Sequence, residues 1–387
     1  MLNAYVPSLS DALTASLRLP RARAIAPHNL VTFRSDKKGL CIWTTDRRTV
    51  LSFMVSDVEG EDSFTVSAKI EDVRKLKQAL KGTEIKISVK GKSMNFTGDT
   101  AFHLPLVKPS FPDVPIPNKS KLRKCSLEIE DIERACTSVI RDPKDAWRDC
   151  VHGTVHISRA ALISTNGQVL IKVNKVTGHR GKAVIVGKSA IRLLTSSTVS
   201  DLFTGKIEVD DKYAWFDLSG GVVIAELLDL DYTSVMNVID AVKNTGIGSD
   251  PKKQRMLSID KKAFTQALKD TSNYWKGDEN NTVLMRTRKN GPELYLDFVE
   301  KGKMRDKDDK PWVSKEERPK PILIGAQTFN TSLTLAYNAQ YIKDLCDATE
   351  GHDLQMWYPD KGTPLSVSET ATIREKGFLG ILAGIAV

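Results

Sequence analysis

The sequence has few cysteines, no long apolar run and no leader-like N-terminus. Its five cysteines among 387 residues are scattered, odd in number and free of C-x-x-C spacing, which argues against a zinc site and for reduced thiols. No apolar run reaches the ~18 residues that a membrane span requires. Residues 1–24 also lack a basic start followed by an apolar stretch. These absences predict a cytoplasmic protein with no bound metal and no membrane partner.

Motifs that carry catalytic chemistry are missing or incomplete. His152 and His156 lack the glutamate of an HExxH metal site. The stretch 178–182 lacks the first glycine and the Ser/Thr of a phosphate-binding loop. Asp229 and Asp231 resemble the carboxylate pair of a metal-dependent nuclease but have no third acid at a useful spacing. We therefore expect neither an enzyme nor a cofactor, with the nuclease as a remote alternative.

Positive charge is in modest excess. The formal net charge is +9, and most of the excess lies in residues 1–120. Such a charge permits contact with a polyanion but is equally typical of an ordinary solvated surface. Charge alone therefore leaves nucleic-acid binding open.

One pattern of local structure recurs three times, which predicts an α+β fold. Residues 70–80, 187–202 and 338–349 have the apolar spacing of amphipathic helices, and alternating strand pairs follow each of them. A second kind of helix is expected near residue 9, from Leu127 and from Leu257. Each repeat would therefore hold two helices packed on antiparallel sheet.

Irregular segments mark the expected domain boundaries. Residues 109–124 and 241–255 are rich in breakers and have no apolar period, so they are typical of linkers. Residues 301–321 are typical of an exposed inserted loop, for which a contact with DNA or a partner is an alternative. We expect three domains, at 1–119, 120–248 and 249–387.

Several stretches, taken in order, resemble the bacterial beta sliding clamp, the beta subunit of DNA polymerase III. The clearest are ALISTNGQVLIKV (161–173) and AVIVGKSAIRLL (183–194) in the middle third. Trp43-Thr-Thr-Asp46, Phe111-Pro112-Asp113 and Asp231-Tyr232 match shorter family signatures. The resemblance covers nearly the whole chain.

The resemblance implies a ring of two chains arranged head to tail, with six similar domains around duplex DNA. Such a homodimer binds DNA without sequence preference, tethers the replicative polymerase and other replication proteins, and has no catalytic activity. It is opened by a clamp loader, and in the cell it is nucleoid-associated during replication. A DNA-binding protein of the same fold that forms no ring remains the main alternative.

Basic residues of the expected helices are the candidate DNA contacts, because phosphate contacts give affinity without sequence preference. The resemblance places Arg21 and Arg148 at DNA-contacting positions, although acidic residues on the same helices weaken the pattern. By pattern alone we add Arg18, Arg23, Arg74, Lys75, Lys77, Arg134, Arg141, Lys144, Lys261 and Lys262.

Clamps of the family bind short partner peptides in an apolar cleft between their second and third domains. Carried over by resemblance, the cleft residues here are Val151, Thr165, Gly167, Gln168, Val169, Leu170, Leu230, Ser234, Val235, Ile381 and Ala383. The family has His-Arg where this chain has Gln168-Val169, proline at Leu230 and commonly arginine at Ser234. We therefore expect a less charged cleft.

Overall fold

The computed structural model describes most of the chain. The described residues are 1–19, 28–37, 39–46, 48–60, 62–108, 114–137, 151–242, 255–272, 282–288, 291–298, 322–329, 334–358, 371–375 and 378–383. Within these ranges, no helix combines the length and the apolar character needed to cross a membrane.

The chain repeats one order of elements three times: a strand, a helix, four strands, a helix and three strands, with small additions. The first repeat comprises β1 (Leu2–Tyr5), α1 (Val6–Ser16), β2 (Leu30–Asp36), β3 (Gly39–Asp46), β4 (Thr49–Val55), β5 (Val58–Glu59), β6 (Phe64–Lys69), α2 (Ile70–Ala79), β7 (Glu84–Lys90), β8 (Ser93–Thr97) and β9 (Ala101–Pro105). The second comprises β10 (Arg123–Ser126), α3 (Ile129–Cys136), β11 (Thr154–Ile157), β12 (Ala161–Thr165), β13 (Val169–Asn174), β14 (Val184–Gly187), α4 (Lys188–Leu194), α5 (Ser197–Ser200), β15 (Phe203–Val209), β16 (Tyr213–Leu218) and β17 (Gly221–Glu226). After α6 (Thr233–Val242), the third comprises β18 (Arg255–Asp260), α7 (Lys261–Asp270), β19 (Thr282–Thr287), β20 (Glu293–Phe298), β21 (Ile322–Phe329), β22 (Thr334–Asn338), α9 (Ala339–Ala348), β23 (Asp353–Tyr358), β24 (Ala371–Glu375) and β25 (Phe378–Leu382).

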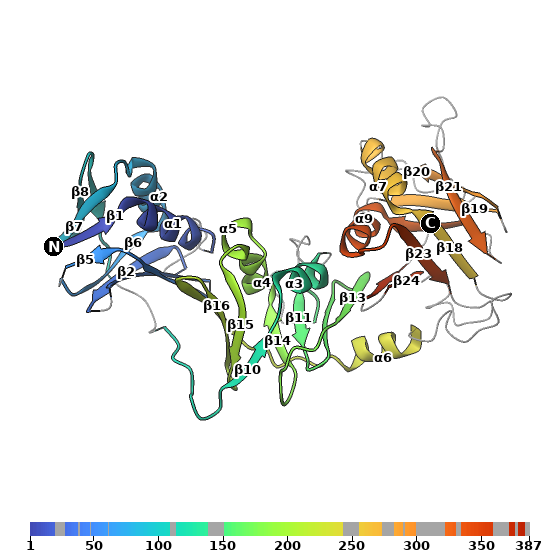
Figure 1. Cartoon of the computed structure of the whole chain (residues 1–387), viewed down its shortest axis with the longest axis horizontal. Helices are drawn as coiled ribbons and strands as arrows, with labels where there is room; N and C mark the ends of the chain where they lie inside the picture. The colour runs from blue at the N-terminus through green and yellow to red at the C-terminus, as the bar shows by residue number, and fades with distance from the viewer. Residues whose placement is uncertain are drawn as a thin grey trace, which may run out of the picture. The chain divides into compact units, whose positions relative to one another are not determined.

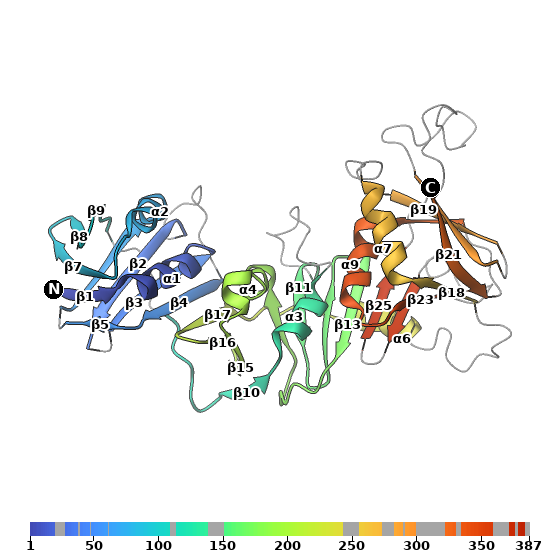
Figure 2. The same ribbon diagram turned by 45° about the horizontal axis from the view of Figure 1, so that its top comes forward.

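Backbone packing divides the chain into two compact units, and the first is Met1–Ile132, Ile157–Arg159 and Val176–Asp229. Its sheets run β5-β1-β7-β8-β9 and β10-β15-β16-β17-β4-β3-β2-β6. Helices α1 and α2 lie side by side on this scaffold (Figures 1 and 2). Leu9 and Leu13 of α1 are fully buried. Their three-to-four spacing puts them on one helix face and leaves the other face polar.

The second compact unit is Glu133–His156, Ala160–Lys175 and Leu230–Val387. Its strands run β11-β12-β13-β25-β24-β23-β18-β21-β20-β19-β22. Helices α7 and α9 pack together over this sheet, with Phe264 and Leu345 fully buried between helix and strand layers.

Successive repeats join by pairing of sheet edges, and the rule is the same both times. The third strand after the first helix of one repeat pairs antiparallel with the last strand of the next repeat. Thus β4 pairs with β17 in the first unit, with Leu51 opposite Val223. In the second unit β13 pairs with β25, with Leu170 opposite Ile381. Pairing removes the exposed edges that both strands would otherwise present.

Most predicted elements form where the periodicity placed them, and two differ. The segment from Leu257 was expected to be wholly helical, but Arg255–Asp260 is strand β18 and the helix begins at Lys261. The Asp260 side chain caps this helix by accepting from Ala263 N–H at 2.6 Å, which fixes its start. Residues 187–202 form two short helices instead of one. The strand expected at 364–369, the motif 111–113 and the loop 301–321 lie outside the described residues.

Candidate functional site

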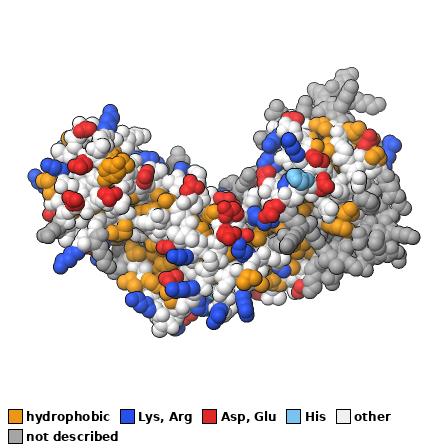
Figure 3. Space-filling model, viewed as in Figure 1, with side chains coloured by type: hydrophobic (Ala, Val, Ile, Leu, Met, Phe, Trp, Pro, Cys, Tyr) orange, Lys and Arg blue, Asp and Glu red, His pale blue; other side chains and the backbone are white. Residues whose placement is uncertain are grey.

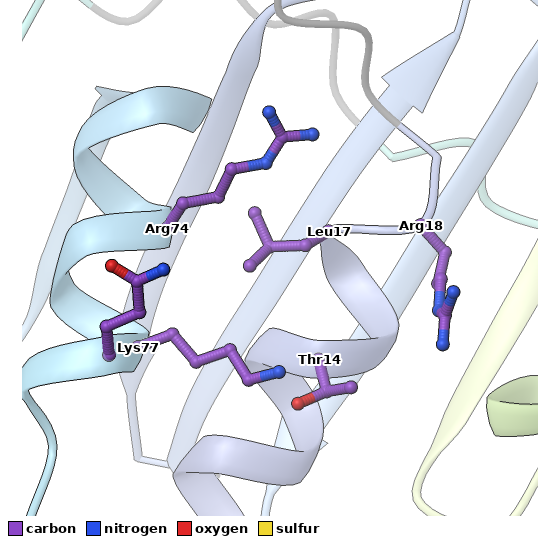
Figure 4. A pocket seen from close by; sticks show the side chains of 6 residues that line it. Thr14, Leu17, Arg18, Arg74 and Lys77 are labelled. Carbon is purple, nitrogen blue, oxygen red and sulfur yellow. The ribbon is translucent and has the colours of Figure 1, made fainter.

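A basic pocket of about 350 Å³ lies between α1 and α2 in the first unit. It is lined by Thr14, Leu17, Arg18, Arg74, Lys77 and Gln78. Figure 4 shows Lys77 reaching from α2 toward Thr14 of α1, with Leu17 between Arg74 and Arg18. None of these six described lining residues is acidic, so their charge favours an anion.

The three cations of this pocket differ in how they are held. Arg18 donates from Nη2 to Thr198 Oγ1 of α5 at 3.0 Å, which fixes its guanidinium at one side. Within the described part of the chain, Arg74 and Lys77 have no ion-pair partner. Neighbouring Lys75 differs, since its Nζ lies 3.6 Å from Asp72 of the same helix. Four predicted DNA contacts, Arg18, Arg74, Lys75 and Lys77, thus lie at this helix pair. Arg74 and Lys77 are the two whose charges have no ion-pair or hydrogen-bond partner among the described residues.

Two predicted DNA contacts in the second unit are already bonded to the end of α9. Arg134 of α3 donates from Nε to Ala348 O at 2.9 Å, and its Nη1 lies 2.6 Å from the Glu350 carboxylate. Its guanidinium also lies 5.4 Å from the centroid of the Phe378 ring. Lys261 donates from Nζ to Thr349 O at 2.7 Å. These two cations satisfy carbonyl groups that a helix leaves unpaired at its C-terminus.

The other predicted DNA contacts are distributed differently. Lys262 is exposed on the first turn of α7. Residues Arg21, Arg23, Arg141, Lys144 and Arg148 lie outside the described residues. Acidic and basic side chains are interspersed over the described surface in Figure 3. The charges on that face therefore do not mark a binding surface. The α1–α2 pocket, by contrast, is a local cluster of positive charge.

One wall of the predicted partner cleft is built by β12, β13 and β25. Val169 and Leu170 start β13, and the pairing with β25 continues past its end, because Ala383 N–H donates to Gln168 O at 2.9 Å. Leu170 and Ile381 are only 6% and 4% exposed, so their side chains would form the floor of the predicted cleft. Gln168 is exposed at its rim.

The turn between β12 and β13 is held by its own side chains. Thr165 Oγ1 donates to Val169 O at 2.8 Å and accepts from Gly167 N–H at 3.1 Å. Gly167 has φ +92°, and a Cβ there would lie 2.9 Å from Cε1 of His152, so the imidazole ring rests on the glycine. Gly153 N–H donates to Thr165 O at 3.0 Å, which attaches the turn around Val151 to the same wall.

The remaining predicted cleft residues lie at the start of α6 and just before it. Val235 is buried, Ser234 is exposed and Leu230 is half-buried. The structure places all of the predicted cleft residues in the second unit. It also adds two residues that resemblance did not select, His152 and Tyr232. Tyr232 is buried, its hydroxyl lies 2.8 Å from Thr154 Oγ1, and its ring centroid lies 4.8 Å from that of His156.

The two carboxylates of the nuclease alternative are engaged in local structure. Asp229 pairs with Lys182 at 3.3 Å. The hydroxyl and backbone N–H of Thr233 both donate to Asp231, and these bonds lower the pKa of its carboxyl. Within the described ranges no three His, Cys, Asp or Glu side chains are grouped to hold a metal. Burial raises the pKa of Cys125 to about 11 and that of Cys346 to about 12, which makes these thiols poor nucleophiles.

The sequence matches no protein-family model and no curated protein. Solved structures match it over its full length. The DNA polymerase III beta subunit of Thermotoga maritima has a TM-score of 0.77 at 14% identity, with 100% of both chains covered. The sliding clamp (DNA polymerase III subunit beta) of Bartonella birtlesii, solved bound to griselimycin, gives 0.77 at 15%, with 100% and 99% covered. The sliding clamp of Bacillus subtilis gives 0.76 at 12%, with 100% and 99% covered. The chain therefore has the fold of bacterial beta sliding clamps, and the fold predicted from the sequence is confirmed.

Proposed function

We propose that this chain is a DNA sliding clamp that forms a ring around duplex DNA and tethers a replicative polymerase. The observation that carries the proposal is the similarity to DNA polymerase III beta subunits over 100% of this chain, with every repeat present. A clamp raises processivity by topology, so its action requires a closed ring, a channel that tolerates any sequence and a site for partners.

The edge-pairing rule within the chain supports ring closure. Under that rule two strands have no partner within the same chain. They are β21, the third strand after the first helix of the last repeat, and β9, the last strand of the first repeat. Among the described residues β9 pairs only with β8, and Ile322–Gly325 of β21 pair only with β20. Leu323 in this segment is 52% exposed. Pairing β21 of each copy with β9 of the other would close a ring of two chains and leave no edge to extend.

The backbone of β9 is oriented to accept that partner. Leu106 N–H donates to Lys92 O on the β8 side, so the alternation along a strand points the N–H of His103 to the open edge. Pro105 lacks an N–H at the equivalent position two residues on, which sets the end of the pairing.

Ring closure can be tested at His103. His103→Pro removes the N–H at the open edge, whereas His103→Ala keeps it and serves as the matched control. We expect the unmodified chain and His103→Ala to sediment at twice the 42.9 kDa chain mass and to show a central hole by negative-stain electron microscopy. His103→Pro should shift toward the monomer. An unmodified chain that forms no ring would leave the fold standing and favour the open DNA-binding alternative.

DNA contact is assigned to the α1–α2 pocket. Arg74 and Lys77 are uncompensated within the described residues, and Thr14 and Gln78 add neutral hydrogen-bonding groups. Such a surface binds the phosphate oxygens of DNA of any sequence, and two contacts per pocket are weak enough to let the DNA slide. The polymerase is assigned to the cleft between the β13–β25 wall and α6, whose apolar floor suits the anchor residues of a short peptide.

A further inference from the structure

Tyr232 connects the two walls of the partner cleft, and it does so from both its backbone and its side chain. On the backbone side it begins α6: Met236 N–H donates to Tyr232 O at 3.0 Å. Asp231 accepts Thr233 N–H at 2.8 Å and caps the same helix end. Tyr232 therefore cannot move without moving the first turn of α6, which bears Ser234 and Val235.

The side chain of Tyr232 reaches the turn around Val151 through a small cluster of hydrogen bonds. Thr154 donates its only hydroxyl proton to Val151 O at 2.8 Å. The Tyr232 hydroxyl lies 2.8 Å from Thr154 Oγ1, and it also lies 3.3 Å from Thr154 O and 3.5 Å from Val151 O, both of which can accept its proton. Tyr232 is thus joined to Val151 both through Thr154 and directly. Gly153 ties the turn around Val151 to Thr165 of the β12–β13 wall.

The surroundings make this link rigid. The Tyr232 ring is 5% exposed and lies against His156 of β11, whose pKa is lowered by burial, so a neutral imidazole packs there at neutral pH. A buried hydroxyl with a partner is costly to leave unpaired, which holds the tyrosine in one geometry.

We propose that Tyr232 is a positioning residue of the partner cleft: its hydroxyl sets the spacing between α6 and the Val151 turn, and thereby the affinity for the polymerase peptide. This inference rests on the proposed function, because it assigns a role within the cleft proposed for the partner. The residue touches no ligand itself, and its effect passes through Val151 and Val235.

The test is Tyr232→Phe, which keeps the ring and removes the hydroxyl alone. Binding of the cognate replicative polymerase to the immobilised full-length chain is measured by surface plasmon resonance. We expect the dissociation constant to rise about fivefold or more, since a mispositioned apolar pocket loses part of its contact. Thr154→Val should give a similar loss, and the double variant should lose no more than either single one, because both remove the same side-chain bond between Tyr232 and Thr154.

A stability-matched control separates positioning from general weakening. Ile239→Val removes one methylene from the buried face of α6 and is expected to lower the melting temperature by about as much as Tyr232→Phe. The proposal requires Ile239→Val to leave polymerase affinity unchanged. Equal losses for both variants, or unchanged affinity in Tyr232→Phe, would overturn it. An unmodified chain that does not bind the polymerase would instead overturn the proposed function itself.

Discussion

Helices α2 and α9 occupy the same place in the first and third repeats, have the same length and end on alanine, yet their ends are treated differently. At α2 the carbonyl of Ala79 accepts a hydrogen bond from the neutral Thr100 hydroxyl at 2.7 Å. At α9 the carbonyl of Ala348 accepts from the Arg134 guanidinium, and that of Thr349 accepts from the Lys261 ammonium. One repeat satisfies its helix end with a neutral group and the other with cations.

This difference bears on the basic residues proposed to contact DNA. At α2 the hydroxyl of Thr100 bonds Ala79, and Arg74 and Lys77 of the same helix line the α1–α2 pocket. In the second unit, Arg134 and Lys261 are held by the negative end of a helix dipole, which attracts cations. Whether a basic residue on a helix is available to bind a ligand therefore depends on the unpaired carbonyl groups near it.

The largest effect is expected from Arg134→Met, which keeps an apolar stem and removes the charge at the end of α9. We expect the free energy of unfolding to fall by about 2 kcal/mol, because a half-buried carbonyl loses a charged donor. DNA affinity should not change. Urea denaturation and fluorescence anisotropy with duplex DNA measure the two effects, and a loss of DNA affinity without a loss of stability would reverse the assignment.

The pocket is tested by Arg74→Ala with Lys77→Ala. Removing two phosphate contacts should weaken duplex DNA binding on the order of tenfold and lower the slope of log affinity against log salt by about two. Stability should stay nearly constant, since both side chains lie at the surface of α2. Lys75→Ala is the matched control on the same helix, because Asp72 already compensates Lys75. An unaltered slope in the double variant would remove the pocket from the DNA path.

The smallest effects are expected at the adjacent pair Lys261 and Lys262. Lys261→Met should lower the free energy of unfolding by about 1 kcal/mol through loss of the bond to Thr349. Lys262→Met, on the exposed side of the same turn, should leave stability unchanged. Chemical denaturation of both variants decides the point, and equal stabilities would mean that the α9 end does not depend on its cation.

Local periodicity predicted the repeated helices and hairpins well. The hairpin β7–β8 forms where alternation and the turn at Gly91, with φ +57°, placed it, and α2 begins at Ile70 as expected. These features depend on neighbours within a few residues, so the sequence contains their cause. The start of α7 was missed because Leu257–Asp260 fits a helical apolar spacing equally well. Pairing with β21 and β23 decides for the strand.

The candidate sites were predicted less completely. Resemblance named the cleft residues from Val151 to Ala383, and the structure brings those of β13, β25 and α6 into one unit. It gave Tyr232 no role there, because a hydrogen bond to Thr154 spans 78 residues and leaves no local pattern. The division into three domains at 119 and 248 stays a prediction, as do the DNA contacts outside the described residues.

The sequence by itself determined the repeating unit, since amphipathic helices and alternating strands are written in short-range spacing. Only the tertiary structure decided which strand edges meet and which cations stay available. Edge pairing joins β4 to β17 and β13 to β25 across long separations, and Arg134 meets Ala348 across 214 residues. Such contacts are chosen by the burial of whole faces and the satisfaction of unpaired backbone groups, and a local pattern carries neither.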